Sequence, residues 1–422
     1  MDSIQPPGEA SSVPEHVPFL RRVSIRNYKS IETADVSLRA LTVLVGRNGS
    51  GKSNFLDALH FVADSLQTSL DHAFTSRGGF KEVRRRLVPT RLDDLNISID
   101  LEVALPGGHR AKYGFVIGFD HEVGLRVQRE TLQVNSLAGP VAYYGVHGYG
   151  VHGGLVEWSL GIIPPPHLGD RLYLVNVSGF AEFRPCYEAL SSMTFYNLNP
   201  DSMKKPQALD TGDLLRRDGS NLANIVGRLG KEQPDTLDRI TKYLSAISPG
   251  IAEIERVPLG PVETLLFRQE PKGGRIHEFY SWSMSDGTLR ALAALVAVNQ
   301  SSSRKEPVSL VGIEEPETAL HPAATGALMD ALREASSHTQ VIVTTHSPDL
   351  LDHVSLETDS LLAVVSDQGK TLIAPIDEAS REAIRNHLYT PGELLRLDQL
   401  EPDRNELRRQ EQVEPAFEED ER

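Results

Sequence analysis

The chain has 422 residues, 40% of them hydrophobic and 24% charged, a balance typical of a globular protein with one large elaborated domain or two domains. Its single cysteine, Cys186, excludes an internal disulfide framework and a cysteine-rich metal site. The formal net charge of −15 excludes nucleic-acid affinity spread over the whole surface, so any DNA contact has to be local.

No apolar stretch approaches the length needed to cross a bilayer. The first 18 residues are polar and contain proline, without the charged and then apolar segments of a secretion signal. We therefore expect a cytoplasmic protein that does not act in a membrane.

The first ordered segment is expected to be β-structure. Residues 23–31 and 34–38 alternate apolar and polar side chains, which predicts two antiparallel strands. The apolar run 41–45 follows, and the helix predicted over 54–65 comes soon after it. The segment between that run and the helix carries the strongest motif in the chain.

Residues 46–53 read Gly-Arg-Asn-Gly-Ser-Gly-Lys-Ser, a complete G-x-x-x-x-G-K-[ST] phosphate-binding loop between a strand and a helix. Glycines let successive backbone N–H groups turn toward phosphate oxygens, Lys52 supplies a point charge, and the Ser53 hydroxyl is suited to Mg²⁺. The helix N-terminus adds its partial positive charge. The residues expected to bind the nucleotide here are Gly46, Asn48, Gly49, Ser50, Gly51, Lys52, Ser53 and Asn54.

The next segment is expected to be antiparallel β-structure, then a loop. Alternation over 95–134 with a turn at Pro106-Gly107-Gly108 predicts a hairpin. Residues 141–154 are rich in glycine, tyrosine and histidine and predict a loop. His147 and His152 could bind a metal, but no third ligand stands at a suitable spacing.

The second half predicts a helical lobe and then a parallel sheet. Apolar residues recur at three- and four-residue steps over 181–248. A strand pair, 251–267 and 275–282 with a turn at 271–274, then leads to a helix over 286–301. The continuous apolar runs 308–313 and 339–344, with a crossover helix over 323–336 between them, are typical of strands buried on both faces of a parallel sheet.

Polar residues at the ends of these strands complete a nucleotide site. Glu314 and Glu315 directly follow a buried strand, where one carboxylate can hold Mg²⁺ and the next can orient or deprotonate a water. Ser285-Asp286-Gly287 opens a helix and offers a hydroxyl and N–H groups to a phosphate. His346 closes the next strand, where it can touch a γ-phosphate.

With these motifs in this order, the chain resembles the SMC/RecF-like AAA family ATPases of the ABC-ATPase superfamily, a group that includes the ATPase parts of OLD-family nucleases. The resemblance covers most of residues 20 to 355. It rests on the opening Ile25-Arg26-Asn27-Tyr28-Lys29-Ser30, the Walker A loop, the signature Ser283-Met284-Ser285-Asp286-Gly287-Thr288, the Walker B string Ile313-Glu314-Glu315-Pro316-Glu317, a D-loop-like Ala319-Leu320-His321-Pro322 and the switch Thr344-Thr345-His346-Ser347-Pro348.

The resemblance implies an α/β fold of the P-loop NTPase, ABC-ATPase type, with a mixed sheet core, an antiparallel β-subdomain and an inserted helical lobe. It also implies a head-to-tail homodimer, or a higher oligomer, with ATP and Mg²⁺ between the Walker A loop of one copy and the signature of the other. The domains expected are a flexible N-terminus 1–18, an N-terminal ATPase lobe 19–140, an insertion 141–280, a C-terminal ATPase lobe 281–365, an extension 366–400 and an acidic tail 401–422.

The resemblance also implies roles for single residues. Lys52 would bind phosphate and assist catalysis, Ser53 and Glu314 would hold the metal, Glu315 would be the catalytic carboxylate, and His346 would sense the γ-phosphate. Ser285 and Gly287 would reach the nucleotide across the dimer. Arg26 and Tyr28 are expected either near the base or phosphates or in ordinary strand packing. No Q-loop glutamine is assignable, because Gln67 lies on the first helix and Gln128 in a strand-like run.

Three functions follow, in order of preference. The first is an ATPase that dimerises on ATP and controls a separate effector, such as a nuclease, in bacterial phage defence or genome maintenance. The second is a RecF-like DNA clamp in repair, whose contacts would be local basic runs; the third is a non-hydrolysing nucleotide-switched scaffold, against which Glu315 argues. A transporter is disfavoured because 232 residues separate Ser53 from Ser285, and the short segment after His346 has no carboxylate cluster for cutting DNA. The basic runs are Lys81, Arg84-Arg85-Arg86 and Arg91, and Lys204-Lys205 with Arg216-Arg217.

Overall fold

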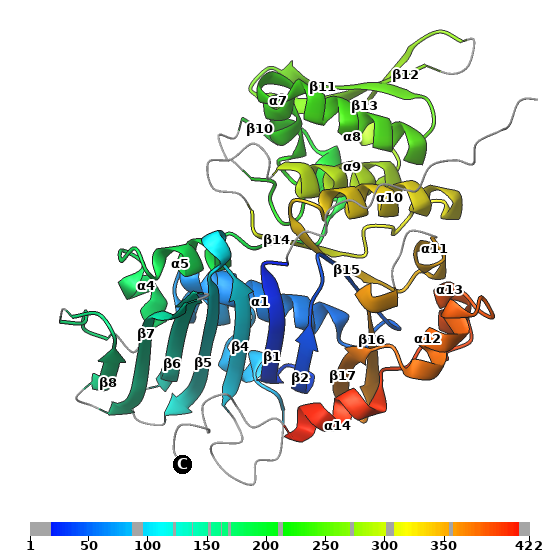
Figure 1. Ribbon diagram of the computed structural model, residues 1–422. Coiled ribbons are helices and arrows are strands. Elements are labelled where there is room, and N and C mark those ends of the chain that lie inside the picture. The colour runs from blue at the N-terminus through cyan, green and yellow to red at the C-terminus, as the bar shows by residue number, and fades with distance from the viewer. Residues whose placement is uncertain are drawn as a thin grey trace, which may run out of the picture.

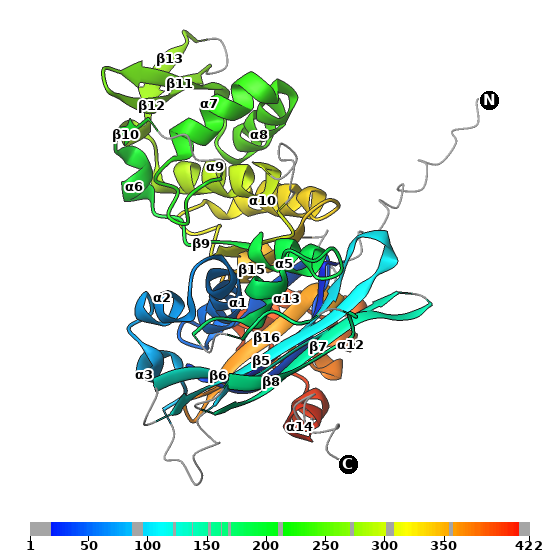
Figure 2. The same ribbon diagram turned by 90° about the vertical axis from the view of Figure 1, so that its left-hand side faces the viewer.

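The computed structural model describes residues 18–86, 96–120, 124–136, 138–150, 153–161, 163–167, 170–209, 214–270, 274–300, 308–353 and 358–412. Within this part, thirteen strands form one mixed sheet and four form a smaller sheet. Figures 1 and 2 show the large sheet in a lower layer and a lobe of helices with the small sheet above it. This arrangement confirms the predicted ABC-ATPase type of α/β fold.

The N-terminal elements surround the phosphate loop. They are β1 (Leu20–Tyr28), β2 (Ile31–Ser37), β3 (Leu41–Val45), α1 (Lys52–Gln67), α2 (Leu70–Thr75) and α3 (Phe80–Val83). β3 is buried at every position, as a central strand requires. Helix α1 begins directly after Gly51, whose φ of 107° lies in the left-handed region that glycine adopts without steric cost.

An antiparallel array extends the sheet from β1. It consists of β4 (Ile97–Ala104), β5 (Arg110–Asp120), β6 (Gly124–Ser136), β7 (Gly139–Gly150) and β8 (Gly153–Trp158). The predicted turn at Pro106–Gly108 joins β4 to β5. Successive strands pair as neighbours from β4 to β8, so this part of the sheet follows chain order.

The loop predicted over 141–154 is wrong, because most of that segment is β7 and the start of β8. Ala142, Tyr144 and Val146 are buried at alternate positions of β7, and Tyr144 pairs with Leu132 of β6. The glycine-rich sequence has a low intrinsic preference for a strand, but β7 forms because the long neighbouring strand β6 supplies its hydrogen-bond partners. His147 lies in β7 opposite Arg129, and His152 lies outside the described residues.

The insertion predicted over 141–280 starts in β7 and β8 of the large sheet and continues through two helices into the upper lobe (Figure 1). Helices α4 (Tyr173–Val177) and α5 (Arg184–Ser191) share the hydrophobic core of the antiparallel array, so the predicted helical lobe begins later than residue 181. Strand β9 (Thr194–Tyr196) then joins the edge of the large sheet. The lobe consists of α6 (Pro200–Lys204), β10 (Gln207–Ala208), α7 (Leu222–Glu232), α8 (Pro234–Ile247), β11 (Ile251–Leu259), β12 (Val262–Gln269) and β13 (His277–Tyr280).

The strand pair predicted after the helices is a three-stranded segment. The run 251–267 is broken into β11 and β12 at Gly260, where φ is +64°. β13 pairs with the other edge of β12. Helix α9 (Asp286–Asn299) follows and is buried on nearly every face, packed between the lobe and the large sheet.

The parallel core brings several strand ends to one edge. β14 (Leu310–Glu314), α10 (Pro322–Ala335) and β15 (Gln340–Thr345) form a strand, crossover helix and strand, as predicted. The register places Glu314 opposite Thr344 and Thr345 opposite Val45. The carboxyl ends of β3, β14 and β15 therefore lie together, next to the phosphate loop.

The C-terminal region is folded onto this core. β16 (Leu361–Asp367) pairs with β3 and spans the boundary predicted at 365/366, and β17 (Lys370–Pro375) lies between β16 and β2. Part of the segment predicted as an acidic tail, 401–422, is the helix α14 (Arg404–Gln412), in which buried Gln410 donates a hydrogen bond to the carbonyl of Ile373 at 2.9 Å. Residues 413–422 lie outside the described part. The helices of this region are α11 (Pro348–Leu351), α12 (Glu378–Arg385), α13 (Pro391–Arg396) and α14 (Arg404–Gln412).

Across the described residues, no helix combines the length and the hydropathy that a bilayer crossing requires.

Candidate nucleotide-binding site

The phosphate loop joins β3 to α1 in a conformation that two glycines permit. Gly49 and Gly51 have φ of 79° and 107°. The Lys52 side chain folds back over the loop, and its ammonium group donates hydrogen bonds to the carbonyls of Gly46 at 2.7 Å and Arg47 at 2.9 Å. Burial lowers the pKa of Lys52, and the charges of Glu315 and Glu317 partly offset this. An ammonium group is thus held inside the loop, facing two carboxylates.

Ser53 and Glu314 meet at the end of the parallel strands. The Ser53 hydroxyl donates a hydrogen bond of 2.7 Å to Oε2 of Glu314. These residues are 261 positions apart in the chain, and the parallel alignment of β3, β15 and β14 brings them together. A hydroxyl and a carboxylate are oxygen ligands of the kind that Mg²⁺ prefers.

Glu315 and His346 form a second pair at the same edge. Nδ1 of His346 lies 3.0 Å from Oε1 of Glu315. Glu315 has a left-handed φ of 43°, uncommon for a residue with a side chain, and its N–H donates to the carbonyl of Thr344 at 3.0 Å. This turn separates the two carboxylates, so that Glu314 contacts Ser53 while Glu315 contacts His346.

Glu317 is a buried neighbour that the sequence reading did not assign a role. It is 5% exposed, and its Oε1 accepts a hydrogen bond from the hydroxyl of Thr345. Burial raises the pKa of Glu317 above its ordinary value. The sequence feature that points to Glu317 is its position two residues after Glu315 in the same short acidic string.

Strand β17 contacts the phosphate loop through a series of side-chain hydrogen bonds. Asn54 donates to the Ser30 hydroxyl at 2.6 Å, the hydroxyls of Ser30 and Thr371 lie 2.6 Å apart, and Thr371 donates to the carbonyl of Ser50 at 3.0 Å. Added side-chain atoms would not fit beside these contacts, because a Cβ on Gly51 would lie 1.9 Å from Oγ1 of Thr371. Sequence reasoning missed Thr371, which has no motif of its own.

The structure places Arg26 and Tyr28 within β1, between β2 and β4. Tyr28 is fully buried in the hydrophobic core, and its hydroxyl donates to Oδ2 of Asp57 on α1 at 2.8 Å. Burial is the largest cause that raises the pKa of Tyr28. Of the two roles expected for Tyr28, strand packing therefore fits the structure better than a contact with the nucleotide.

The signature residues stand at the start of α9, which Figures 1 and 2 place in the layer above α1. The Ser285 hydroxyl caps the helix by accepting a hydrogen bond from the N–H of Thr288 at 3.2 Å. Gly287 is buried against the turn after β14, where a Cβ would lie 2.3 Å from the carbonyl oxygen of Ala319. Ser285 is exposed and Gly287 is not.

Asn197, which belongs to no motif, lies one residue past β9 at the edge of the large sheet. β9 runs parallel to β14 with Tyr196 opposite Ile313, so Asn197 follows at the level of Glu314. The two glutamines considered for the Q-loop make contacts elsewhere. Gln67 donates to the carbonyl of Ser191, and Gln128 accepts a hydrogen bond from Asn96 at 2.6 Å. A three-residue strand has too little alternation to be recognised in a sequence, which explains why Asn197 was missed.

The sheet, the phosphate loop and the paired acids define a P-loop nucleotide-binding domain of the ABC-ATPase type. Residues 41–135 and 205–352 match the family described as "AAA domain, putative AbiEii toxin, Type IV TA system", and the chain belongs to this family. The resemblance to SMC/RecF-like ATPases related to OLD proteins is thereby confirmed.

Two relatives are informative. The chain is 35% identical over 95 residues to the DNA replication and repair protein RecF of Gloeobacter violaceus, covering 22% of this chain and 24% of that protein. It is 24% identical over 351 residues to the Old nuclease of Escherichia phage P2, covering 79% of this chain and 57% of the nuclease. The chain thus spans only part of the length of these relatives.

Among solved structures, the SMC head domain from Thermotoga maritima aligns with a TM-score of 0.44 and 16% sequence identity, covering 85% of this chain and 99% of that chain.

The residues of the site fit ATP and Mg²⁺. The buried hydroxyl of Ser50 has no hydrogen-bond partner among the described residues, although it stands in the middle of the loop. Together with the ammonium group of Lys52 and the loop N–H groups, it forms a donor set suited to phosphate oxygens. Among the residues that the structure describes, no group of three or more His, Cys, Asp or Glu side chains is arranged to hold a metal.

Proposed function

We propose that this protein hydrolyses ATP to ADP and phosphate with Mg²⁺. The observation that carries the proposal is the 2.7 Å contact between Ser53 and Glu314 beside the Glu315–His346 pair. These contacts bring the phosphate loop together with the acids at the end of β14. The chain belongs to a family of AAA domains, which supports nucleotide binding by these residues.

The roles that we propose follow from the contacts. Lys52 and the loop N–H groups bind the phosphates, while Ser53 and Glu314 hold the metal. Glu315 orients the attacking water and accepts its proton, and His346, which touches Glu315, senses the terminal phosphate. When bound, Mg²⁺ supplies positive charge that stabilises negative charge on the phosphate oxygens.

We further propose that two copies associate head to tail on ATP. Ser285 is exposed at the start of α9, in a different layer from the phosphate loop of its own chain (Figure 2). Its hydroxyl and the helix N-terminus would complete the site of a second copy. Gly287 would keep the backbone close to the turn at Ala319, so that the signature and this turn move together.

We also propose that the dimer controls a separate effector, such as a nuclease, in bacterial phage defence or genome maintenance. The alignment with the Old nuclease covers most of this chain but leaves 43% of the nuclease unmatched, since it covers 57% of that protein. The printed name of this relative, a nuclease, suggests the kind of effector. This part of the proposal rests on analogy between relatives.

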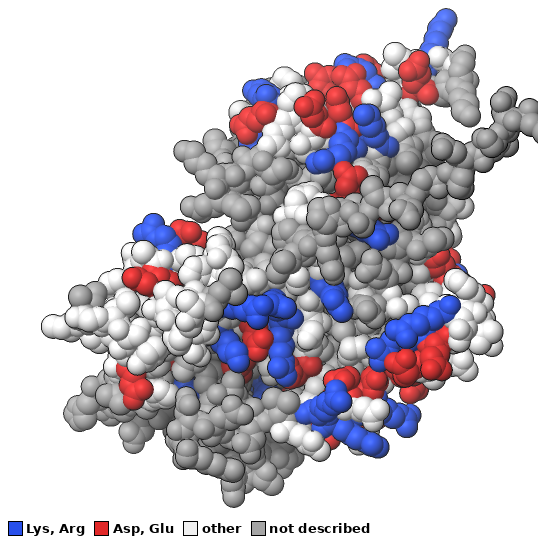
Figure 3. Space-filling view, viewed as in Figure 1, with Lys and Arg blue, Asp and Glu red and all other residues white. Residues whose placement is uncertain are grey.

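The DNA-clamp alternative is weakened by ion pairs within the basic runs. Arg85 pairs with Glu32 at 3.1 Å, Arg86 with Glu82 at 2.6 Å, and Lys204 with Asp286. Figure 3 likewise shows Asp and Glu side chains among the Lys and Arg side chains gathered over β1 and β4. Paired cations release fewer counterions on binding DNA. Arg91 lies outside the described residues.

The test measures ATP turnover against magnesium concentration, together with molar mass by light scattering with and without ATP. Glu315→Gln should lower turnover about a hundredfold or more and retain an ATP-bound dimer. Lys52→Ala should abolish ATP affinity and association together. Unchanged turnover in Glu315→Gln would remove Glu315 from its role, and no magnesium-dependent ATP affinity in the wild-type protein would defeat the proposal.

A further inference from the structure

The turn that carries Arg217 is fixed against the edge of the large sheet. The N–H groups of Asn197 and Asn199 donate to the carbonyls of Arg217 and Asp218, each at 3.0 Å. Within the turn, the N–H of Gly219 donates to the carbonyl of Arg216 at 2.9 Å, and Gly219 has a left-handed φ of 78°. The backbone of Arg217 therefore has one defined place beside β9.

The guanidinium group of Arg217 lies at the acids of the nucleotide site. Its Nη2 is 3.7 Å from Oε1 of Glu314, whose Oε2 accepts the hydrogen bond from Ser53. The same carboxylate is thus approached by Ser53 on one oxygen and by Arg217 on the other. A separation of 3.7 Å is too long for a hydrogen bond, so this N–H is available for a closer acceptor.

His60 of α1 orients the other side of the guanidinium group. Nδ1 of His60 lies 3.2 Å from Nη1 of Arg217 and 3.1 Å from Nη2 of Arg77. Guanidinium groups only donate, so this Nδ1 has to be an acceptor, and the proton is on Nε2, which lies 3.2 Å from Asp64. A neutral imidazole accepts a hydrogen bond from Arg217 without neutralising its charge.

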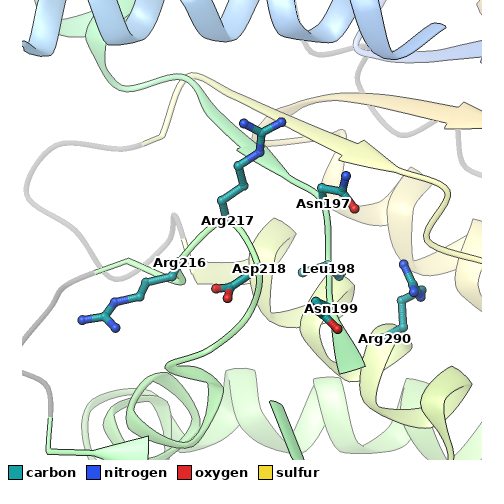
Figure 4. Close-up of a pocket in the computed structure, with 7 residues that line it drawn as sticks. All are labelled: Asn197, Leu198, Asn199, Arg216, Arg217, Asp218 and Arg290. Carbon is teal, nitrogen blue, oxygen red and sulfur yellow. The ribbon is translucent and has the colours of Figure 1, made fainter. Parts of the chain in front are cut away.

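The turn also borders an open cavity of about 700 Å³ in which arginines outnumber acids. Arg217 points toward the segment that leads from β9 to Asn197, whereas Arg216 points away from it (Figure 4). Asp218 is engaged locally, because its carboxylate accepts from the N–H of Ser220 at 3.0 Å. The cavity is lined by Asn197, Leu198, Asn199, Arg216, Arg217, Asp218 and Arg290.

We propose that Arg217, on the inserted segment, contacts the terminal phosphate of a nucleotide bound to the phosphate loop of the same chain. The inference rests on the proposed function. A phosphate offers the guanidinium group two oxygens at once, a stronger acceptor than one carboxylate oxygen at 3.7 Å. Because the turn is bonded to β9 and continues into α7, this contact makes the inserted lobe respond to whether the third phosphate is present.

The test compares affinities for ATP and ADP, measured with fluorescent nucleotide analogues on the full chain, and ATP turnover. Arg217→Ala should weaken ATP binding about tenfold or more and leave ADP binding within about twofold. Turnover should fall by a similar or larger factor. Arg217→Lys keeps the charge without the two-pronged geometry and should fall between the wild type and Arg217→Ala. Arg216→Ala is the matched control and should bind both nucleotides within about twofold of wild type.

Two results would overturn the inference: ATP and ADP affinities that both stay at the wild-type level in Arg217→Ala, or equal losses for ATP and ADP, which indicate a disturbed loop. Thermal unfolding of each variant separates misfolding from lost contact, and Arg217→Lys preserves the test if alanine destabilises the turn. A wild-type protein that does not bind ATP would defeat the proposed function itself, which is a distinguishable failure.

Discussion

The hydroxyl of Thr371 on β17 fills the space beside Gly51 in the phosphate loop, where a Cβ would lie 1.9 Å from Oγ1 of Thr371. Its hydrogen bond to the carbonyl of Ser50 holds the loop from the C-terminal side of the chain. Because Thr371 donates its one hydroxyl proton to the carbonyl of Ser50, the hydroxyl of Ser30 has to donate to Thr371. The hydroxyl of Ser30 in turn accepts a hydrogen bond from Asn54. A strand late in the sequence thereby sets the shape of a loop near the beginning.

Thr371→Val should weaken ATP affinity about threefold to tenfold, because it keeps the branched shape but removes the hydroxyl that donates to Ser50. Equilibrium titration with a fluorescent ATP analogue measures this. Thr241→Val is a matched control, since it removes a hydroxyl that donates to the carbonyl of Leu237 in α8 at 2.8 Å, away from the site. Equal affinities for wild type and Thr371→Val would show that the loop keeps its shape without β17.

His346→Ala should lower ATP turnover about a hundredfold, because Glu315 loses the imidazole 3.0 Å from its carboxylate. ATP affinity should change little, since the phosphate loop is untouched. Steady-state kinetics and nucleotide titration separate these effects. His353→Ala is the control, as its imidazole lies 3.7 Å from the carboxylate of Asp330, a partner outside the site. A loss of affinity as large as the loss of turnover would contradict the assigned role of His346.

Gly287→Ala should impair ATP-dependent association and lower the melting temperature by a few degrees, because the new Cβ would press on the carbonyl oxygen of Ala319 at 2.3 Å. The two nearest atoms, the carbonyl oxygen and carbon of Ala319, belong to the backbone and cannot rotate away as a side chain can. In Gly326→Ala the nearest atom is the ring of His353 at 2.6 Å, which can rotate, so this control should be milder. Light scattering and thermal unfolding measure the two effects, and a Gly287→Ala protein that associates normally would refute the prediction.

Glu130 should make stability depend on pH. This side chain is fully buried, and burial raises its pKa from 4.5 to about 7, although Tyr113, Tyr144 and the N–H groups of Tyr173 and Leu174 donate to it. The folded state binds the proton more tightly than the unfolded chain, so the stability from Glu130 is present below about pH 4.5 and is lost as pH rises through about 7.

Melting temperatures of wild type and Glu130→Gln between pH 5 and 8 test this expectation, in ~0.5 unit steps. The difference between the two proteins should change across this range, with wild type losing a few degrees relative to the variant as pH rises. Burial likewise raises the pKa of Asp100 to about 7, so only the difference between the proteins isolates Glu130. A constant difference would show that Glu130 keeps the same protonation state in the folded and unfolded chains.

Local sequence patterns predicted the elements that carry complete motifs or long apolar runs. The loop at 46–53, the buried runs of β14 and β15 and the crossover helix between them lie where they were expected. The predictions failed where long-range pairing overrides local composition. Glycine-rich β7 forms because β6 and β8 flank it, and α14 forms an ordered helix on β17 although its composition is mostly charged.

By itself, the sequence determined which chemical groups are present: a phosphate loop with its lysine, two adjacent acids after a buried strand, and a histidine after the next. These groups can be recognised from the sequence because each stands in a short motif at the end of a strand or the start of a helix. Only the tertiary structure decided that Thr371, Asn197 and Arg217 stand beside them. Strand pairing brings in Thr371 and Asn197, and a turn more than a hundred residues from the loop brings in Arg217. No periodicity in one segment encodes which distant segment will be its neighbour.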